Sequence, residues 1–147
     1  MTVALSGKDL ASRIEEKYTG SIEESTQDSL VVRTDSLLKV ARYLKDTEDL
    51  LLDYFNYVTA VDYYSYFEVV YQLTSTEHNH MVLLKTRCYD RENPTVPSVT
   101  GLWQGADFQE REIYDLMGIN FEGHPNMKRI FLWEGFQGHP LRKDFLQ

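Results

Sequence analysis

The sequence has a single cysteine, Cys88, among 147 residues. One thiol cannot close a disulfide within the chain, and it cannot supply the set of cysteine ligands that a zinc site or an iron–sulfur cluster needs. The longest apolar runs, such as residues 81–84, are also far shorter than the roughly 20 residues required to cross a bilayer. The sequence therefore excludes an intrachain disulfide, and we expect no membrane span and no cysteine-held metal.

Basic residues are in deficit. Fifteen lysines and arginines face 23 aspartates and glutamates, and the formal net charge is −8. This is the wrong sign for a chain whose main partner is a nucleic acid. The last 25 residues reverse the balance, with four basic and two acidic side chains, so the C-terminal segment is locally cationic.

Common enzyme signatures are missing as well. The sequence contains no Gly-x-Gly-x-x-Gly, no phosphate-binding loop and no Gly-x-Ser-x-Gly elbow. Cys88 lies in a predicted strand with no histidine near it in sequence, so we expect a buried structural thiol and not a nucleophile. Hydrophobic residues make up 42% and charged residues 26%, which is typical of a folded domain. These features favour one domain that performs no chemistry by itself.

Apolar residues recur at helical spacing in three segments. The first helix is predicted from a capping box at residues 6–9 to Gly20, and the second begins near residue 34 or 35 and ends near residue 45. The third is predicted from a capping-box pattern at residues 107–110 and ends at Gly118.

Strand patterns occur between these helices. Residues 30–32, 54–61, 66–73 and 81–89 are rich in β-branched and aromatic side chains, and residues 90–97 are expected to form a loop. The sequence therefore predicts an α+β fold: two N-terminal helices packed on a small, mostly antiparallel sheet, then a further helix near residues 107–117, then an extended irregular C-terminal arm.

The expected arm is residues 123–147, which follow an α+β domain of residues 1–122. Two Gly-His-Pro triplets and the lack of any period indicate irregular chain. The arm nevertheless carries nine large apolar residues, namely Met127, Ile130, Phe131, Leu132, Trp133, Phe136, Leu141, Phe145 and Leu146. Because irregular chain cannot build a core of its own, we expect the arm to lie on a partner protein; the alternative is that part of it folds back over this chain's own sheet.

Two side-chain groups are candidates for chemistry. The histidines at residues 78–80 and at His124 and His139 lack the spacing of a metal site, so we expect backbone hydrogen bonds from the latter two.

The second group is Glu110, Arg111, Glu112 and Asp115 in the last helix. Paired carboxylates are able to perform acid–base chemistry. The helical spacing instead favours a structural or interfacial ion network, with an Arg111–Asp115 pair at i, i+4.

Six segments of the chain carry a resemblance to a known family, most of them in the final helix and the arm: residues 59–63, 67–71, 110–119, 121–125, 128–130 and 138–145. In these segments the sequence resembles the C subunit (30 kDa subunit) of respiratory complex I, the proton-pumping NADH:quinone oxidoreductase. Asn126 and Lys128 depart from the aspartate and arginine that are usual in the family.

The resemblance implies a non-catalytic, hydrophilic subunit of the peripheral arm of an oxidoreductase. Such a subunit packs on the large hydrogenase-like subunit near the quinone-reducing region and contacts other peripheral-arm subunits. It implies no catalytic, cofactor-binding or metal residue in this chain, with NADH, FMN, iron–sulfur clusters and quinone held by partner subunits. The implied location is peripheral, on the cytoplasmic side of the cell membrane, or on the matrix side of the inner membrane in a mitochondrion.

The resemblance also assigns interface or motif residues by position. Four of them, Glu110, Arg111, Glu112 and Asp115, are expected to order the last helix against the arm or partner, and Arg129, Arg142 and Lys143 are expected to make charged contacts across the interface. The remaining motif residues are Gly118, Gly123, His124, Pro125, Gly138, His139, Pro140, Leu141 and Asp144.

Two alternatives remain open from the sequence. The nearer is the equivalent subunit of a membrane-bound nickel–iron hydrogenase or of another complex linked to coenzyme F420 or ferredoxin. The more distant is a free-standing acid–base enzyme that uses Glu112 and Asp115.

Overall fold

The computed structural model describes residues 2–132 and 137–143. Its elements, in chain order, are β1 (Val3–Ala4), α1 (Gly7–Lys17), β2 (Ile22–Ser25), β3 (Ser29–Val32), the 3-10 turn η1 (Thr34–Ser36), α2 (Leu37–Asp46), β4 (Tyr54–Asp62), β5 (Phe67–Ser75), β6 (His80–Cys88), β7 (Thr95–Pro97), α3 (Ala106–Met117) and β8 (Asn120–Glu122).

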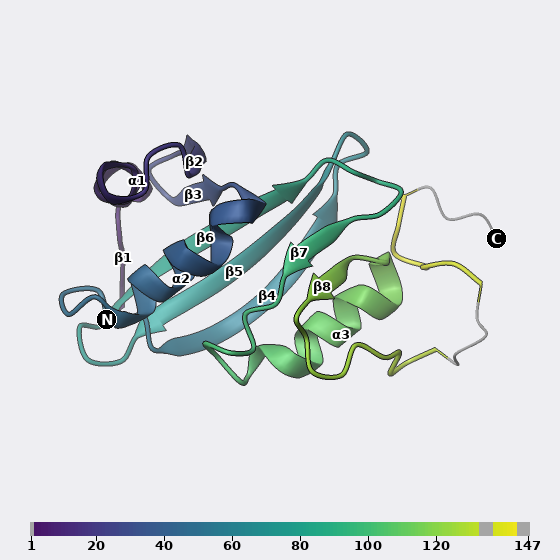
Figure 1. Ribbon diagram of the computed structural model, residues 1–147. Coiled ribbons are helices and arrows are strands. Elements are labelled where there is room, and N and C mark those ends of the chain that lie inside the picture. The colour runs from purple at the N-terminus through teal and green to yellow at the C-terminus, as the bar shows by residue number, and fades with distance from the viewer. Residues whose placement is uncertain (1, 133–136, 144–147) are drawn as a thin grey trace.

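The main sheet has the strand order β2-β3-β6-β5-β4, with β1 on the same edge of β6 as β3 (Figure 1). β4, β5 and β6 form an antiparallel meander, β2 pairs antiparallel with β3, and β1 and β3 run parallel to β6. The meander register aligns Val58, Tyr71 and Leu84 across three strands on the buried face. The α+β class with a mostly antiparallel sheet is confirmed.

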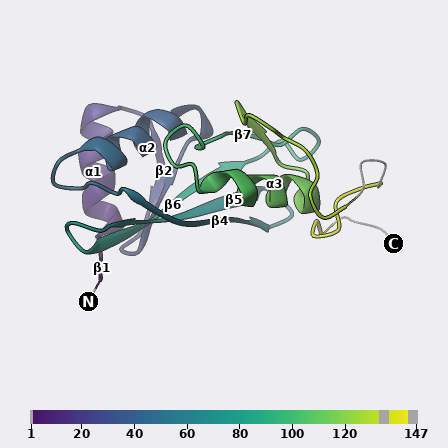
Figure 2. The same cartoon turned by 90° about the horizontal axis from the view of Figure 1, so that it is seen from below.

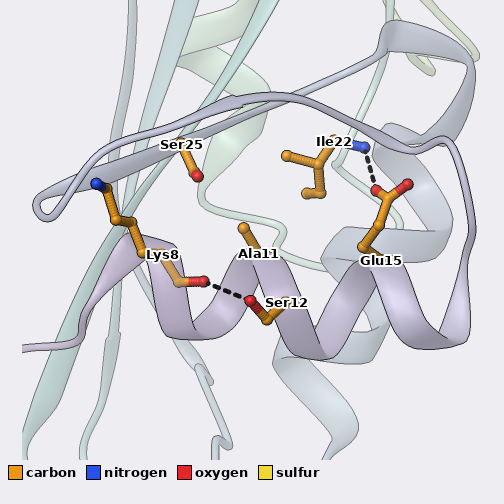
Figure 3. A pocket seen from close by; sticks show the side chains of 6 residues that line it. All are labelled: Lys8, Ala11, Ser12, Glu15, Ile22 and Ser25. Carbon is orange, nitrogen blue, oxygen red and sulfur yellow. Dashed lines mark hydrogen bonds between the residues drawn. The ribbon is translucent and has the colours of Figure 1, made fainter.

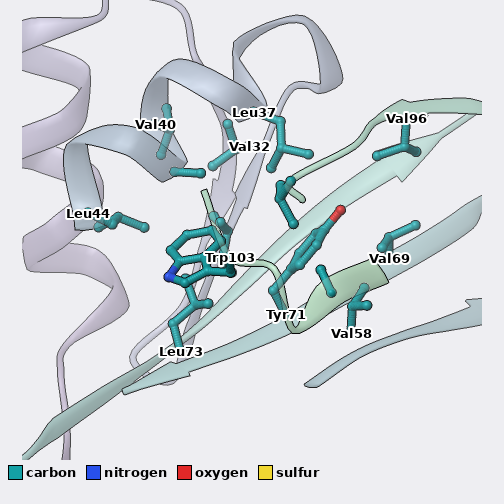
Figure 4. Packing of buried hydrophobic residues seen from close by; sticks show 14 of the residues in the cluster. Val32, Leu37, Val40, Leu44, Val58, Val69, Tyr71, Leu73, Val96 and Trp103 are labelled. Atoms are coloured by element: carbon teal, nitrogen blue, oxygen red, sulfur yellow. The ribbon is translucent and has the colours of Figure 1, made fainter. Parts of the chain in front are cut away.

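The helices bury apolar side chains against this sheet. α1 packs on β2 and β3, and α3 packs on β4. α2 places Leu37, Val40, Ala41 and Leu44, at helical spacing, in the same hydrophobic core as Tyr71 of β5 (Figure 4). Seen from below, α2 and α3 cover one face of the meander (Figure 2).

Two local predictions are corrected. Residues 95–97, expected in a loop, form β7 and pair parallel with β8. Val96 is fully buried, and a three-residue strand is too short to show a period. The capping box expected at residues 107–110 does not form: α3 begins at Ala106 without a side-chain cap, because the Glu110 side chain turns instead to residues 98 and 99.

The described part of the arm, residues 123–132 and 137–143, contains no helix or strand. Met127 packs against the core, whereas Phe131 and Leu141 remain more than half exposed. The expectations for Trp133, Phe136, Asp144, Phe145 and Leu146 lie outside the described residues. Within those residues, no helix is both long and apolar enough to cross a bilayer.

Candidate functional site

One face of α3 holds the arm. Phe108, Arg111 and Asp115 are spaced three and four residues apart, so they follow one stripe along the helix. The Phe131 ring meets the Phe108 ring edge to face, with centroids 6.2 Å apart, and Arg111 Nε donates to the carbonyl oxygen of Lys128 at 3.2 Å. Residues 128–132 therefore lie along this stripe, beside α3 in Figure 1.

Asp115 is the centre of this contact. Its Oδ2 accepts hydrogen bonds from three consecutive backbone N–H groups, those of Ile130 at 3.1 Å, Phe131 at 2.7 Å and Leu132 at 3.1 Å. Arg129 Nε lies 3.4 Å from Oδ1. Both side chains are buried, with 0% of Asp115 and 8% of Arg129 exposed. One carboxylate thus fixes four successive residues of the arm.

These donors determine the charge state of Asp115. Burial opposes the charge, but the three backbone N–H groups and the guanidinium outweigh it and hold the pKa of the carboxyl below its ordinary value. A charged carboxylate surrounded by donors is a strong acceptor. Asp115 is therefore suited to hold backbone and is unsuited to exchange protons at neutral pH.

A second contact closes at the C-terminal end of α3. Gly118 ends the helix in the left-handed region with φ of 77°, and the His139 ring lies against it, so that a Cβ on Gly118 would sit 2.7 Å from that ring. His139 Nδ1 lies 2.9 Å from the carbonyl oxygen of Asp115, and the N–H of Leu141 donates to the carbonyl oxygen of Leu116. The helix end is thus capped by residues 139–141 of the arm.

His124 makes a third contact. The backbone N–H of Asn126 donates to Nδ1 of His124, which assigns the ring proton to Nε2. Nε2 lies 3.1 Å from the carbonyl oxygen of Asp107 and 2.9 Å from its carboxylate. His124 and His139 contact backbone, as expected. Within the described ranges, no group of three or more histidine, cysteine, aspartate or glutamate side chains is placed to hold a metal ion.

The end of the described arm is held at the far end of β4. Asp62 forms a bidentate ion pair with Arg91, at 2.7 and 3.0 Å, and also accepts the backbone N–H of Lys143 at 2.8 Å. Arg142 donates to the carbonyl oxygen of Arg91 and lies over the ring of Phe67. The ion pair with Arg91 and the backbone N–H donors hold the pKa of the Asp62 carboxyl well below its ordinary value. Asp62 belongs to a family segment but had no predicted role, because nothing local in the sequence points to a partner 29 residues away.

Glu110 lies in the core and not at the arm. It is fully buried, and its carboxylate accepts the hydroxyl of Ser98 at 2.7 Å and the backbone N–H of Val99 at 2.9 Å. Burial raises its pKa, and these two donors only partly oppose the shift. The hydroxyl of Tyr71, also buried, has no hydrogen-bond partner among the described residues.

The structure corrects the expected ion network on α3. Arg111 does not pair with Asp115 but with the carbonyl oxygen of Lys128, and the cation beside Asp115 is Arg129. Glu112 is exposed. The acid–base alternative needs Glu112 and Asp115 in one accessible site, whereas Asp115 is covered by the arm, so the geometry does not support it.

Four of the remaining motif residues are glycines and prolines of the described arm. Gly123 and Gly138 have φ of 86° and 90°, which favours glycine. Pro125 is exposed and Pro140 partly buried. Asp144 lies outside the described residues. Whether any motif residue touches a partner remains a prediction.

A surface hollow of about 590 Å³ lies away from this junction, between α1 and β2 (Figure 3). Its lining residues are Lys8, Ala11, Ser12, Glu15, Ile22 and Ser25. Glu15 already accepts the backbone N–H groups of Ile22 and Gly20. The acidic group of the hollow is therefore already engaged by backbone. Cys88 lies elsewhere and is buried in the core, as expected.

The lowered pKa values of the two carboxyl groups that hold the arm, Asp62 and Asp115, give a pH prediction. A carboxyl whose pKa is lower in the folded than in the unfolded chain stabilises the fold above about pH 4 and loses that contribution as the pH falls through its folded pKa. Asp62 and Asp115 belong to this class, whereas Glu110, with a raised pKa, has the opposite sign. We therefore expect the free energy of unfolding, measured in urea, to fall between about pH 5 and pH 2. The Asp62→Asn variant should show a shallower fall; an equal slope in that variant would contradict the assignment.

The fold and the contacts of the arm define a class of protein: a small α+β domain in which buried acidic side chains hold a C-terminal arm. Comparison with known proteins identifies the family. The model of the family "Respiratory-chain NADH dehydrogenase, 30 Kd subunit" matches residues 30–147. The C subunit of the NADH-quinone oxidoreductase of Roseiflexus sp. (strain RS-1) is 41% identical over 138 residues, which are 92% of this chain and 79% of that protein. The mitochondrial NADH dehydrogenase [ubiquinone] iron-sulfur protein 3 of Candida albicans is 44% identical over 120 residues, 80% of this chain and 42% of that protein.

A solved structure supports the same fold. A chain of the membrane-bound sulfane sulfur reductase, an archaeal respiratory membrane complex, is similar with a TM-score of 0.75 and 25% identity, over 94% of this chain and 84% of that chain. The chain described here belongs to the respiratory-chain NADH dehydrogenase 30 kDa subunit family.

Proposed function

We propose that this chain is a non-catalytic structural subunit of the peripheral arm of a proton-translocating NADH:quinone oxidoreductase. It would pack on the large hydrogenase-like subunit near the quinone-reducing region. The family assignment supports the kind of complex. The observation that carries the structural role is the use of the motif: Asp115, Arg129 and His139 all form hydrogen bonds with this chain's own backbone.

The redox chemistry would then reside in partner subunits. NADH, FMN, iron–sulfur clusters and quinone are proposed to bind there, and this chain would contribute to turnover by assembly alone. The single buried thiol of Cys88 supports this division of work, because a cluster needs several cysteine ligands. The complex would place the chain peripherally on the cytoplasmic side of the cell membrane, or on the matrix side in a mitochondrion.

A second candidate is the equivalent subunit of a complex with another electron donor. The observation that favours it is the similarity to a chain of a sulfane sulfur reductase complex. The shared fold does not indicate which electron donor is used, because the electron donor would bind to other subunits.

The test is identification of what accompanies the chain. We expect that gentle detergent extraction and affinity purification of the chain from its own cells yield the large hydrogenase-like subunit together with an NADH-oxidising subunit, identified by mass spectrometry. An F420, hydrogen or ferredoxin subunit in its place would establish the second candidate. Recovery of the chain alone, or turnover by the isolated chain, would overturn the structural role.

A further inference from the structure

One edge of the main sheet is a long strand with almost no charge. β4 is the last strand in the sheet order, so within this sheet it has a neighbour on one side only (Figure 1). Residues 54–61 of this strand include no charged residue, no proline and no glycine. Long uncharged edge strands are templates for pairing with another chain, and proteins normally protect them. The edge of β4 therefore needs a protection that its own sequence does not supply.

Gln109 of α3 occupies the middle of this edge. α3 packs on β4, and Oε1 of Gln109 accepts the backbone N–H of Val58 at 2.8 Å. Because that N–H is bonded to α3, it points away from β5 and belongs to the free edge. We propose that Gln109 guards the edge of β4 against antiparallel pairing with a second copy of this chain. The inference goes beyond the subunit role and holds whichever complex takes up the chain.

The opposite edge of the sheet uses the same device. Glu15 of α1 accepts the backbone N–H of Ile22, in the edge strand β2, at 3.1 Å. β2 is also protected in two further ways, because it has only four residues and two of them are glutamates. A side chain from a neighbouring helix thus occupies an N–H at each edge. β4 lacks the other two protections, so more depends on Gln109.

The occupant that fits the edge of β4 is β4 of a second copy. In an antiparallel pair centred on Thr59, Val58 of one copy would face Ala60 of the other, and each Val58 N–H would donate to the facing carbonyl. On the other face Tyr57, 37% exposed, would lie opposite Val61, 36% exposed. Aromatic and β-branched side chains form favourable cross-strand pairs, and no like charges would meet. Gln109 already holds the N–H that this pairing needs.

The test is the oligomeric state of the whole chain, measured by light scattering with salt added to screen its net charge of −8. The wild-type chain should be a monomer, and Gln109→Ala should have about twice its molar mass at the same concentration. Gln109→Glu keeps an acceptor for the Val58 N–H and should stay a monomer. The matched control is Gln104→Ala, since Gln104 is exposed in the turn before α3, and it should also stay a monomer.

A second substitution locates the contact between the two copies. Thr59→Lys, added to Gln109→Ala, places two lysines opposite each other at the centre of the pair, so it should restore the monomer. Melting temperatures show whether each variant is folded. If Gln109→Ala does not fold, Gln109→Leu takes its place, because leucine fills the site without an acceptor.

Three results would overturn the inference. The first is a folded, monomeric chain that carries Gln109→Ala or Gln109→Leu. The second is a dimer of either variant that persists when Thr59→Lys is added. The third is a wild-type chain that is already a dimer and that Thr59→Lys dissociates. None of these results bears on the proposed subunit role, which is tested separately by co-purification.

Discussion

Replacing Asp115 with alanine should lower the free energy of unfolding by about 3 kcal/mol and release the arm from α3. The substitution leaves three backbone N–H groups without their acceptor and Arg129 without its counter-charge, and loss of one partner from a buried pair is costly. Urea unfolding gives the magnitude, and faster trypsin cleavage after Arg129 reports release of the arm.

Two variants make this result specific. Asp115→Asn keeps the size and one acceptor oxygen but turns an amide donor toward other donors, so an intermediate loss is expected. Glu112→Ala removes an exposed carboxylate three residues away and should change stability by less than about 0.5 kcal/mol. Equal effects of Asp115→Ala and Glu112→Ala would refute the role given to Asp115.

Replacing Glu110 with alanine should cost a similar amount, about 3 kcal/mol, through a different mechanism. Glu110 is fully buried, so its removal leaves a cavity and strands the N–H of Val99 and the hydroxyl of Ser98. The arm should stay protected from trypsin at temperatures well below the melting point, because Glu110 does not touch it. Urea unfolding and the same digestion check both statements.

The matched variant here is Glu110→Gln. Its amide oxygen accepts the N–H of Val99 and its amide nitrogen donates to Ser98, so most of the stability should be retained. It also removes a carboxyl whose pKa burial raises, so it should remove the destabilisation that ionised Glu110 causes as the pH rises. A Gln variant as unstable as the Ala variant would show that the two hydrogen bonds are not what Glu110 contributes.

Sequence patterns were sufficient where contacts are local. The stripe of apolar residues in α2, the three long strands and the end of α3 at Gly118 follow from side-chain periodicity and from the left-handed preference of glycine. The strands β7 and β8 could not be predicted in this way, because each has only three residues and is defined by pairing with the other, more than 20 positions away in the chain.

The junction shows why local rules failed for the polar residues. Helical spacing predicts an Arg111–Asp115 pair, which on an exposed helix is worth a few tenths of a kcal/mol. Three backbone donors and a buried guanidinium from the arm outcompete it. The ion pair between Asp62 and Arg91 is equally non-local, and no sequence pattern around either residue predicts it. Asp115 and Arg129 were both predicted to be motif residues, but no sequence pattern indicated that their side chains meet.

The most direct test is amide hydrogen exchange on the isolated chain. If the buried acids hold the arm before assembly, then the N–H groups of Ile130, Phe131 and Leu132, which all donate to Asp115, should exchange at least tenfold more slowly than unstructured peptide. Exchange of those three amides at the unstructured rate, in a chain whose β5 and β6 amides are protected, would mean that the arm is ordered only by a partner and would contradict the account.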